Sequence, residues 1–193
     1  MSELDKQQED SLRQSFKQFN KLMLSMWRLG LGSFVNIWPN VIGRIMVLTH
    51  TGRKTRIRRR TPLNYAVVNG EVYCTAGFGM NSDWYQNIMV YPHVEIWLPG
   101  SWWAGTAKDV TEEEGALEKM RQVIMASGFA GRLAGLDACR MTDEALMEAT
   151  KDYRLVHIQR NQARTGRDGP GDLAWFWPLA TILLLLLSFR RRK

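Results

Sequence analysis

The pair Asn69-Gly70 is the sequence feature that most limits how this chain can fold. Two runs of strand-forming residues, PLNYAVV (62–68) and EVYCTAG (71–77), flank the pair directly. Asn-Gly is the strongest short-range signal for a two-residue hairpin turn, because both central residues must adopt a positive φ. Residues 62–77 are therefore predicted to form a tight antiparallel hairpin.

Further strand-like segments lie on either side of this hairpin. RIMVLTHT (44–51) precedes it, HVEIWL (93–98) and WWAGTAKDV (102–110) flank Pro99-Gly100, and YRLVHIQR (153–160) follows. Segments joined by short turns favour a mostly antiparallel sheet of about six strands. A doubly wound dinucleotide-binding fold is excluded, since it needs strands that alternate with helices throughout and a Gly-x-Gly-x-x-Gly turn.

Three helical segments follow the first strands. SDWYQNIMVY (82–91) starts with two cap candidates, and TEEEGALEKMRQVIMASG (111–128) opens with a capping-box pattern of Thr111 and Glu114. MTDEALMEATKD (141–152) carries Thr142 as its cap. Strands and helices together predict the α+β class, with a small six-stranded barrel or strongly curled sheet and flanking helices.

The composition divides the chain into four segments. Residues 1–32 form an amphipathic helix, whose apolar stripe either packs on the domain or lies on a membrane surface. Residues 33–163 hold the barrel, and residues 164–172, rich in Gly and Arg, form a linker. Residues 173–193 are predicted to be a membrane-associated hydrophobic tail.

This tail begins with seventeen uncharged residues, LAWFWPLATILLLLLSF, and ends in RRRK. As a helix it would measure roughly 26 Å, just short of a hydrocarbon core of about 30 Å. Apolar residues on every face make a buried helix of a soluble protein the weaker alternative. We expect a location at the cell membrane, with the folded domain on the cytoplasmic side. The tail would either span as a transmembrane helix or dip into the inner leaflet.

The net charge of +7 predicts an anionic partner without choosing one. Six positive charges fall between Arg53 and Arg60, inside THTGRKTRIRRRTPLNY (49–65). A turn at Gly52 would project Arg53 and Lys54 with Thr55 beside them, and backbone amides with two cations make an anion pocket. The alternative is a solvated charged face. The spacing does not match a nucleotide-binding P-loop, which needs adjacent Gly-Lys.

Other ligand classes fit less well. Strand alternation would send Arg58 and Arg60 to one face and Arg59 to the other, so the three cannot share one phosphate. Nucleic acid is not expected, because the tryptophans lie outside the basic run and a hydrophobic tail is unusual on such a protein. A metal site is not expected either, since the histidines are far apart and the two cysteines follow no metal spacing.

A second cluster, TAGFGMNSDWYQN (75–87), places small residues at a strand end before a capped helix. The small side chain of Ala76 and the missing ones of Gly77 and Gly79 would let a flat ring approach the backbone closely. The following helix N-terminus offers further amides. Such glycines are also common in plain turns.

The order TGRK, TPL-x-Y, NG, TAGFG and DWYQN resembles the deazaflavin-dependent nitroreductase and quinone reductase family over about residues 43 to 160. These are split β-barrel proteins that use coenzyme F420 and are related to FMN-binding barrels. The resemblance implies hydride transfer from reduced F420 to a quinone or nitroaromatic compound. It implies that the basic turn binds the phosphate and that the ring lies against the second cluster. The implied cofactor contacts are Arg53, Lys54, Thr55, Arg59, Arg60, Thr61, Pro62, Leu63, Asn64, Thr75, Ala76, Gly77, Asp83, Trp84, Tyr85, Gln86 and Asn87.

The chain departs from the family pattern near the substrate. Some members carry serine and lysine where this chain has Ala76 and Gly77, and tyrosines where it has the Phe129 region. Phe129 and Phe78 are the candidate substrate contacts, and Tyr65 is the candidate proton donor. The remaining expectations are contact with membrane lipid and a homodimer. The alternative is a split barrel that binds FMN or another cofactor and has no deazaflavin activity.

Overall fold

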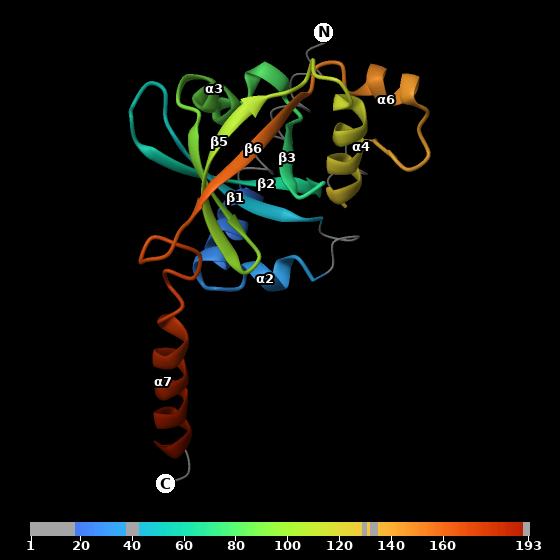
Figure 1. Ribbon diagram of the computed structural model, residues 1–193. Helices are drawn as coiled ribbons and strands as arrows, with labels where there is room; N and C mark the ends of the chain where they lie inside the picture. The colour runs from blue at the N-terminus through green and yellow to red at the C-terminus, as the bar shows by residue number, and fades with distance from the viewer. Residues whose placement is uncertain (1–17, 38–42, 129–130, 132–134, 191–193) are drawn as a thin grey trace, which may run out of the picture.

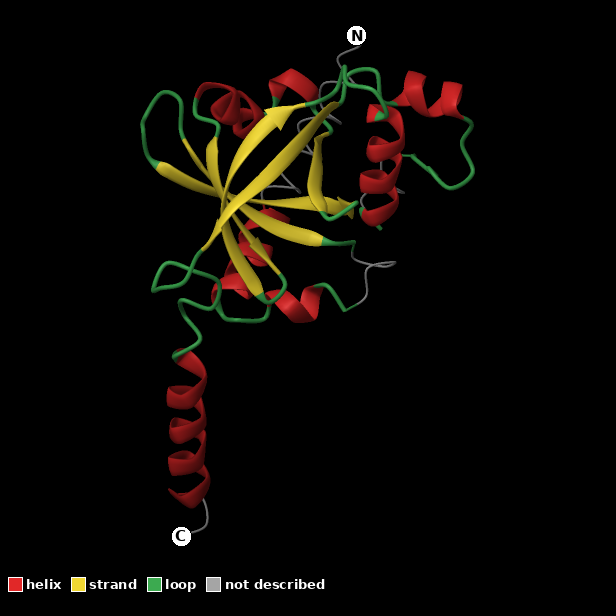
Figure 2. Ribbon diagram, viewed as in Figure 1, coloured by secondary structure: helices red, strands yellow, loops and turns green. Residues whose placement is uncertain are grey.

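Six strands form one closed barrel in the order β1-β2-β3-β6-β5-β4, in which each recorded strand pair is antiparallel (Figure 1 and Figure 2). This computed structural model describes residues 18–37, 43–128, 131 and 135–190. The predicted class and strand number are confirmed. The strands are β1 (Ile45–Thr51), β2 (Arg58–Val68), β3 (Glu71–Ala76), β4 (His93–Leu98), β5 (Ser101–Asp109) and β6 (Arg154–Ala163).

The predicted Asn-Gly hairpin joins β2 to β3. Asn69 and Gly70 have φ values of 53° and 83°, and Val68 pairs with Glu71 across the turn. Two positive φ values match the twist of the flanking strands, which is why Asn-Gly occupies this turn. Strand β2 begins at Arg58 rather than at residue 62, so the last three arginines of the basic run belong to the strand.

Strand alternation separates two apolar clusters. Inside the barrel, Met46 and Leu48 of β1 pack with residues of the other strands. On the outer face, Val47 packs with Trp97 and with Trp27 of the N-terminal helix, whose described part covers residues 18–28. Of the two alternatives for this helix, packing on the domain is the one observed for its described part.

Most of the helices lie around the barrel, and the C-terminal helix extends away from it (Figure 1). The predicted capping box at Thr111 is wrong, because the helix starts five residues later, after Gly115 with a φ of 71° and no side-chain cap. The Thr111 hydroxyl instead donates to Asp109 at 2.6 Å. The predicted cap at Thr142 is confirmed, since it accepts from the Ala145 amide. Besides the N-terminal helix, the labelled helices are α2 (Gly32–Val35), the 3-10 helix η1 (Gly79–Asn81), α3 (Asp83–Val90), α4 (Ala116–Ala126), α6 (Asp143–Ala149) and α7 (Phe176–Arg190).

The segment 164–172 lies along the barrel before α7 projects away from it (Figure 1). Arg28 binds the Asp172 carboxylate at 2.9 Å, and the Gly171 amide donates to the Trp27 carbonyl at 2.9 Å. The large apolar side chains of α7 are 44–67 % exposed. Among the described residues, none of the helices has the length and apolar character needed to cross a bilayer, so the expected transmembrane helix is not found.

Candidate cofactor site

The loop between β1 and β2, residues 52–57, is closed by two backbone hydrogen bonds. The Gly52 amide donates to the Ile57 carbonyl at 2.9 Å, and the Arg56 amide donates to the Gly52 carbonyl at 2.8 Å. A Cβ atom on Gly52 would stand 2.9 Å from Thr55 Oγ1 and 3.0 Å from Arg59 Nε. The missing side chain therefore leaves room over the turn for both a hydroxyl and a guanidinium.

Ion pairs divide the basic run into two groups. Arg53, Arg58 and Arg60 each lie beside a carboxylate, at 2.9 Å from Asp83, 2.7 Å from Glu95 and 4.0 Å from Asp172 respectively. Within the described ranges, Lys54, Arg56 and Arg59 lack a carboxylate partner, and all three are exposed. The predicted separation of Arg58 and Arg60 from Arg59 is confirmed. These three unpaired side chains, which we call the free cations, can bind an anion.

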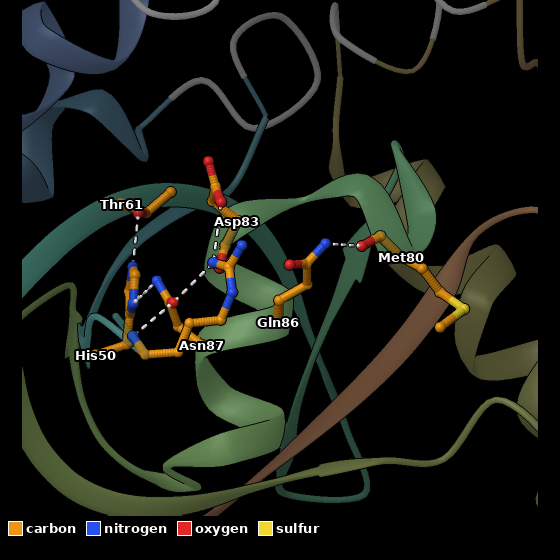
Figure 3. A network of polar contacts seen from close by, with 7 residues as sticks. His50, Thr61, Met80, Asp83, Gln86 and Asn87 are labelled. Carbon is orange, nitrogen blue, oxygen red and sulfur yellow. Dashed lines mark hydrogen bonds and ion pairs between the residues drawn. The ribbon is translucent and has the colours of Figure 1, made fainter. Parts of the chain in front are cut away.

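Arg53 connects the loop to helix α3. Its backbone amide donates to Asn87 Oδ1 at 2.9 Å, and its Nη1 donates to the same oxygen at 3.0 Å and to Asp83 Oδ1 at 2.9 Å (Figure 3). These bonds bring the first sequence cluster against the second, although thirty or more positions separate their residues. Arg53 thus connects the loop to α3, whereas the free cations have no such partner on that helix among the described residues.

His50, which the sequence analysis did not single out, lies at the centre of this contact. It is 3 % exposed, and its ring nitrogens lie 3.2 Å from Asn87 Nδ2 and 3.1 Å from Thr61 Oγ1 (Figure 3). Burial lowers the pKa of His50 from 6.5 to about 4, and the nearby charge of Arg59 acts in the same direction. The imidazole is therefore neutral at physiological pH. A single histidine in a strand gives no sequence signal for this role.

The other side chains of helix α3 point in different directions. Tyr85 is buried in the barrel core, where its hydroxyl donates to the Asp109 carboxylate. Burial and this bond raise the pKa of Tyr85 to about 12. Trp84 is partly buried with its ring edge-on to Tyr85, and Gln86 Nε2 donates to the Met80 carbonyl at 2.6 Å (Figure 3).

The end of β3 presents little polar side-chain surface. Ala76 is 1 % exposed and belongs to the same core cluster as Tyr85, whereas Gly77 is exposed. A Cβ on Gly77 would meet the Tyr153 ring at 3.6 Å, which is ordinary contact, so space alone does not require glycine there. Thr75 pairs with Leu155 of β6, and Phe78 is 40 % exposed.

Alternation along β2 divides the remaining predicted contacts between the two faces of the barrel wall. Thr61, Leu63 and Tyr65 follow Arg59 on the inner face, and burial raises the pKa of Tyr65. Arg60 and Pro62 lie on the outer face, where Arg60 covers the Trp97 ring at 4.6 Å. The predicted residues that face outward or point elsewhere are Arg60, Pro62 and Asn64, whose amide donates to the Arg44 carbonyl.

A pocket of about 370 Å³ lies on the outer barrel face, beside the loop. Its walls include Thr49, Arg58, Glu95 and Gln162, but no residue of 75–77 or of α3. The predicted substrate contact Phe129 lies outside the described residues.

A closed antiparallel barrel with unpaired cations at one loop defines a class of small barrel proteins that can hold a phosphorylated ligand. A sequence profile of the family described as F420H(2)-dependent quinone reductase matches residues 24–139, which is more than half of the chain. The chain belongs to this family, whose members are oxidoreductases that use coenzyme F420.

Several solved structures are similar to parts of this chain. The conserved hypothetical protein Rv2991 of Mycobacterium tuberculosis is 20 % identical, with 69 % of this chain and 80 % of that chain covered and a TM-score of 0.47. An F420-H2 dependent reductase, FDR-A, is 19 % identical, with coverages of 60 % and 94 % and a TM-score of 0.45. The heme storage protein HutZ of Vibrio cholerae is 12 % identical, with coverages of 62 % and 82 % and a TM-score of 0.44. Among curated proteins, no sequence matches this chain.

Proposed function

We propose that this protein transfers a hydride from reduced F420 to a quinone or nitroaromatic acceptor at a membrane. The observation that carries the proposal is the β1–β2 loop with the start of β2, where the free cations are Lys54 and Arg56 of the loop and Arg59, whose guanidinium lies over the bare Gly52 turn. The loop belongs to the segment that matches the family of F420H(2)-dependent quinone reductases.

The residues of the loop fit the acidic part of F420. The coenzyme carries a phosphate and a polyglutamate tail, both anionic, and charge-assisted hydrogen bonds to such groups are the strong ones. Lys54, Thr55 and Arg59 would bind the phosphate, because the Thr55 hydroxyl and the Arg59 guanidinium both lie over Gly52. Arg56, exposed above the Tyr91 ring at 5.0 Å, is available to the tail.

When reduced and bound, the deazaflavin supplies the hydride from its C5 position. The protein contributes binding and orientation: Arg53 and Asn87 hold the loop against α3, and the exposed backbone at Gly77 allows a ring to approach. Tyr65 stays the candidate proton donor, although it is only 6 % exposed. An acceptor that takes its proton from water would need no donor residue.

Parallel titrations with F420 and FMN test the cofactor assignment. Fluorescence is expected to show F420 binding at least tenfold more tightly than FMN, and the reduced complex is expected to transfer electrons to menaquinone. Tight FMN binding without F420 binding would instead establish an FMN barrel. F420 binding with no turnover of quinones or nitroaromatics would contradict the proposed acceptors.

We further propose that α7 attaches the protein to lipid. Its apolar side chains cover every face and are exposed, which is unusual for a helix in contact with water. Trp175 just before its start, Trp177 in its first turn and Arg190 at its end are residue types that favour membrane interfaces. The β1–β2 loop and α3 lie at the opposite end of the barrel from α7 (Figure 1). In this proposal α7 therefore anchors the enzyme and does not line the route of the acceptor.

Removing residues 173–193 tests the attachment. The shortened protein is expected to lose most of its co-sedimentation with phospholipid vesicles, because eleven exposed large apolar side chains are removed. Its F420 affinity should stay unchanged, since Asp172 and the loop are retained. Equal sedimentation of both proteins would show that α7 is not the anchor.

A further inference from the structure

The polar network of Figure 3 links the β1–β2 loop to Thr61 through two buried side chains, Asn87 and His50. We propose that His50 is a positioning residue, which holds the Thr61 hydroxyl as a hydrogen-bond donor toward F420 bound at this loop. The inference rests on the proposed function and assigns a role to a residue outside the predicted set.

The orientation of the Asn87 amide is fixed by Arg53. Two N–H groups of Arg53, the backbone amide and Nη1, approach one Asn87 side-chain atom at 2.9 and 3.0 Å, so that atom must be the acceptor oxygen. The reversed amide would place its own N–H groups against both donors. The Asn87 NH₂ group therefore faces His50 Nδ1 at 3.2 Å.

This orientation determines the tautomer of His50. Because Asn87 donates, His50 Nδ1 must accept and carry no proton, and the neutral ring then carries its proton on Nε2. The Nε2 atom lies 3.1 Å from Thr61 Oγ1, and its N–H group donates to that oxygen. The Thr61 hydroxyl, already an acceptor, keeps its own hydrogen, for which the described residues offer no acceptor.

The surroundings of His50 keep the ring neutral. The charged groups around it are Arg59 of β2 and Asp83 at the start of α3, and Asp83 is already paired with Arg53 at 2.9 Å. A second ring proton on Nδ1 would point at the Asn87 NH₂ group. That NH₂ group would then lose Nδ1 as its hydrogen-bond acceptor. Protonation would thus break the network between the loop and Thr61.

The Thr61 hydroxyl hydrogen would be available to the part of F420 that joins the ring to the phosphate. Thr61 follows Arg59 by two residues on the same face of β2, which places the two Cα atoms about 7 Å apart. Hydroxyl oxygens of a polyol that joins a flavin-type ring to its phosphate are acceptors. A phosphate held by Lys54 and Arg59 would bring such an oxygen within reach of Thr61, whose side chain is only half buried.

The tautomer can be measured on the full-length, ¹⁵N-labelled protein in detergent without cofactor. Long-range ¹H–¹⁵N spectra are expected to show His50 protonated on Nε2 only and unchanged between pH 8 and about pH 5, in line with its low pKa. The His50→Gln spectrum assigns the resonance. A proton on Nδ1, or titration near the ordinary value of 6.5, would overturn the inference.

Binding of F420 tests the role of the network. Thr61→Val and His50→Phe are each expected to weaken binding by about 3- to 10-fold, the usual effect of one hydrogen bond. The double variant should be no weaker than either single one, because both changes remove the same bond. Thr61→Ser, which keeps the hydroxyl, should bind like the unmodified protein.

Other results contradict the inference in separable ways. Multiplied losses in the double variant, or an effect of only one single variant, would show that His50 does not act through Thr61. If His50→Phe fails to fold, the His50 tautomer measured in the unmodified protein still tests the inference. Failure of the unmodified protein to bind F420 would reject the proposed function and this role together.

Discussion

Replacing Lys54 and Arg59 together by alanine is expected to weaken F420 binding by at least about 100-fold. Both side chains are exposed, and within the described residues neither has a carboxylate partner. Each would make a hydrogen bond to a charged phosphate oxygen, an interaction worth about 1.5–3 kcal/mol. The affinity of the purified double variant, measured by fluorescence titration, checks this expectation.

The matched control removes a cation elsewhere. Arg140→Ala deletes an exposed guanidinium that lies 3.6 Å from Asp137, away from the loop, and should leave F420 affinity within about twofold. Arg53→Ala is a different case, because its main expected effect is a loosened contact between the loop and α3. If the Lys54/Arg59 double variant and Arg140→Ala lost F420 affinity equally, F420 would be attracted to the basic protein in general rather than bound at a phosphate site.

Trp97→Ala is expected to lower the free energy of unfolding by about 3–5 kcal/mol. Trp97 is 0 % exposed, its ring lies 6.4 Å from that of Trp27, and Arg60 covers it at 4.6 Å. The substitution leaves a cavity between the barrel wall and the N-terminal helix. Urea unfolding followed by circular dichroism measures the change.

Two further substitutions separate packing from other effects of the indole. Trp97→Phe should cost clearly less than Trp97→Ala, because it keeps most of the volume and removes an N–H group that has no partner among the described residues. Trp175→Ala, at a side chain that is 60 % exposed, should change stability by less than about 0.5 kcal/mol. Similar losses from all three would contradict the assigned role of Trp97 in the core.

Much of the fold could be predicted because it depends on local chemistry. Asn69 and Gly70 specify their turn because both readily adopt a positive φ. The two-residue alternation of side chains along a strand is enough to place Arg59 on one face and Arg58 and Arg60 on the other. The start of α4 could not be predicted in this way. The Thr111 hydroxyl oxygen accepts a hydrogen bond from the Leu155 amide at 2.9 Å. This tertiary contact holds Thr111 away from the helix N-cap position that its local pattern indicated.

The sequence indicated two clusters for the candidate site but not the pairing of their side chains. Sequence pointed to the basic run and to the helix that carries Asn87 as two separate clusters. It could not show that Arg53 is paired with Asp83 while Lys54 is not, because ion pairs depend on which side chains meet across the fold. His50 was missed for the same reason, since its two partners come from another strand and from α3.

The sequence by itself determined the hairpins, the alternation of strand faces and the presence of a cationic turn, since each depends on backbone preferences or on neighbours along the chain. Only the tertiary structure decided which cations stay unpaired, which histidine is buried and which way its proton points. Those properties arise from desolvation and from partners distant in sequence, which closure of the barrel brings together.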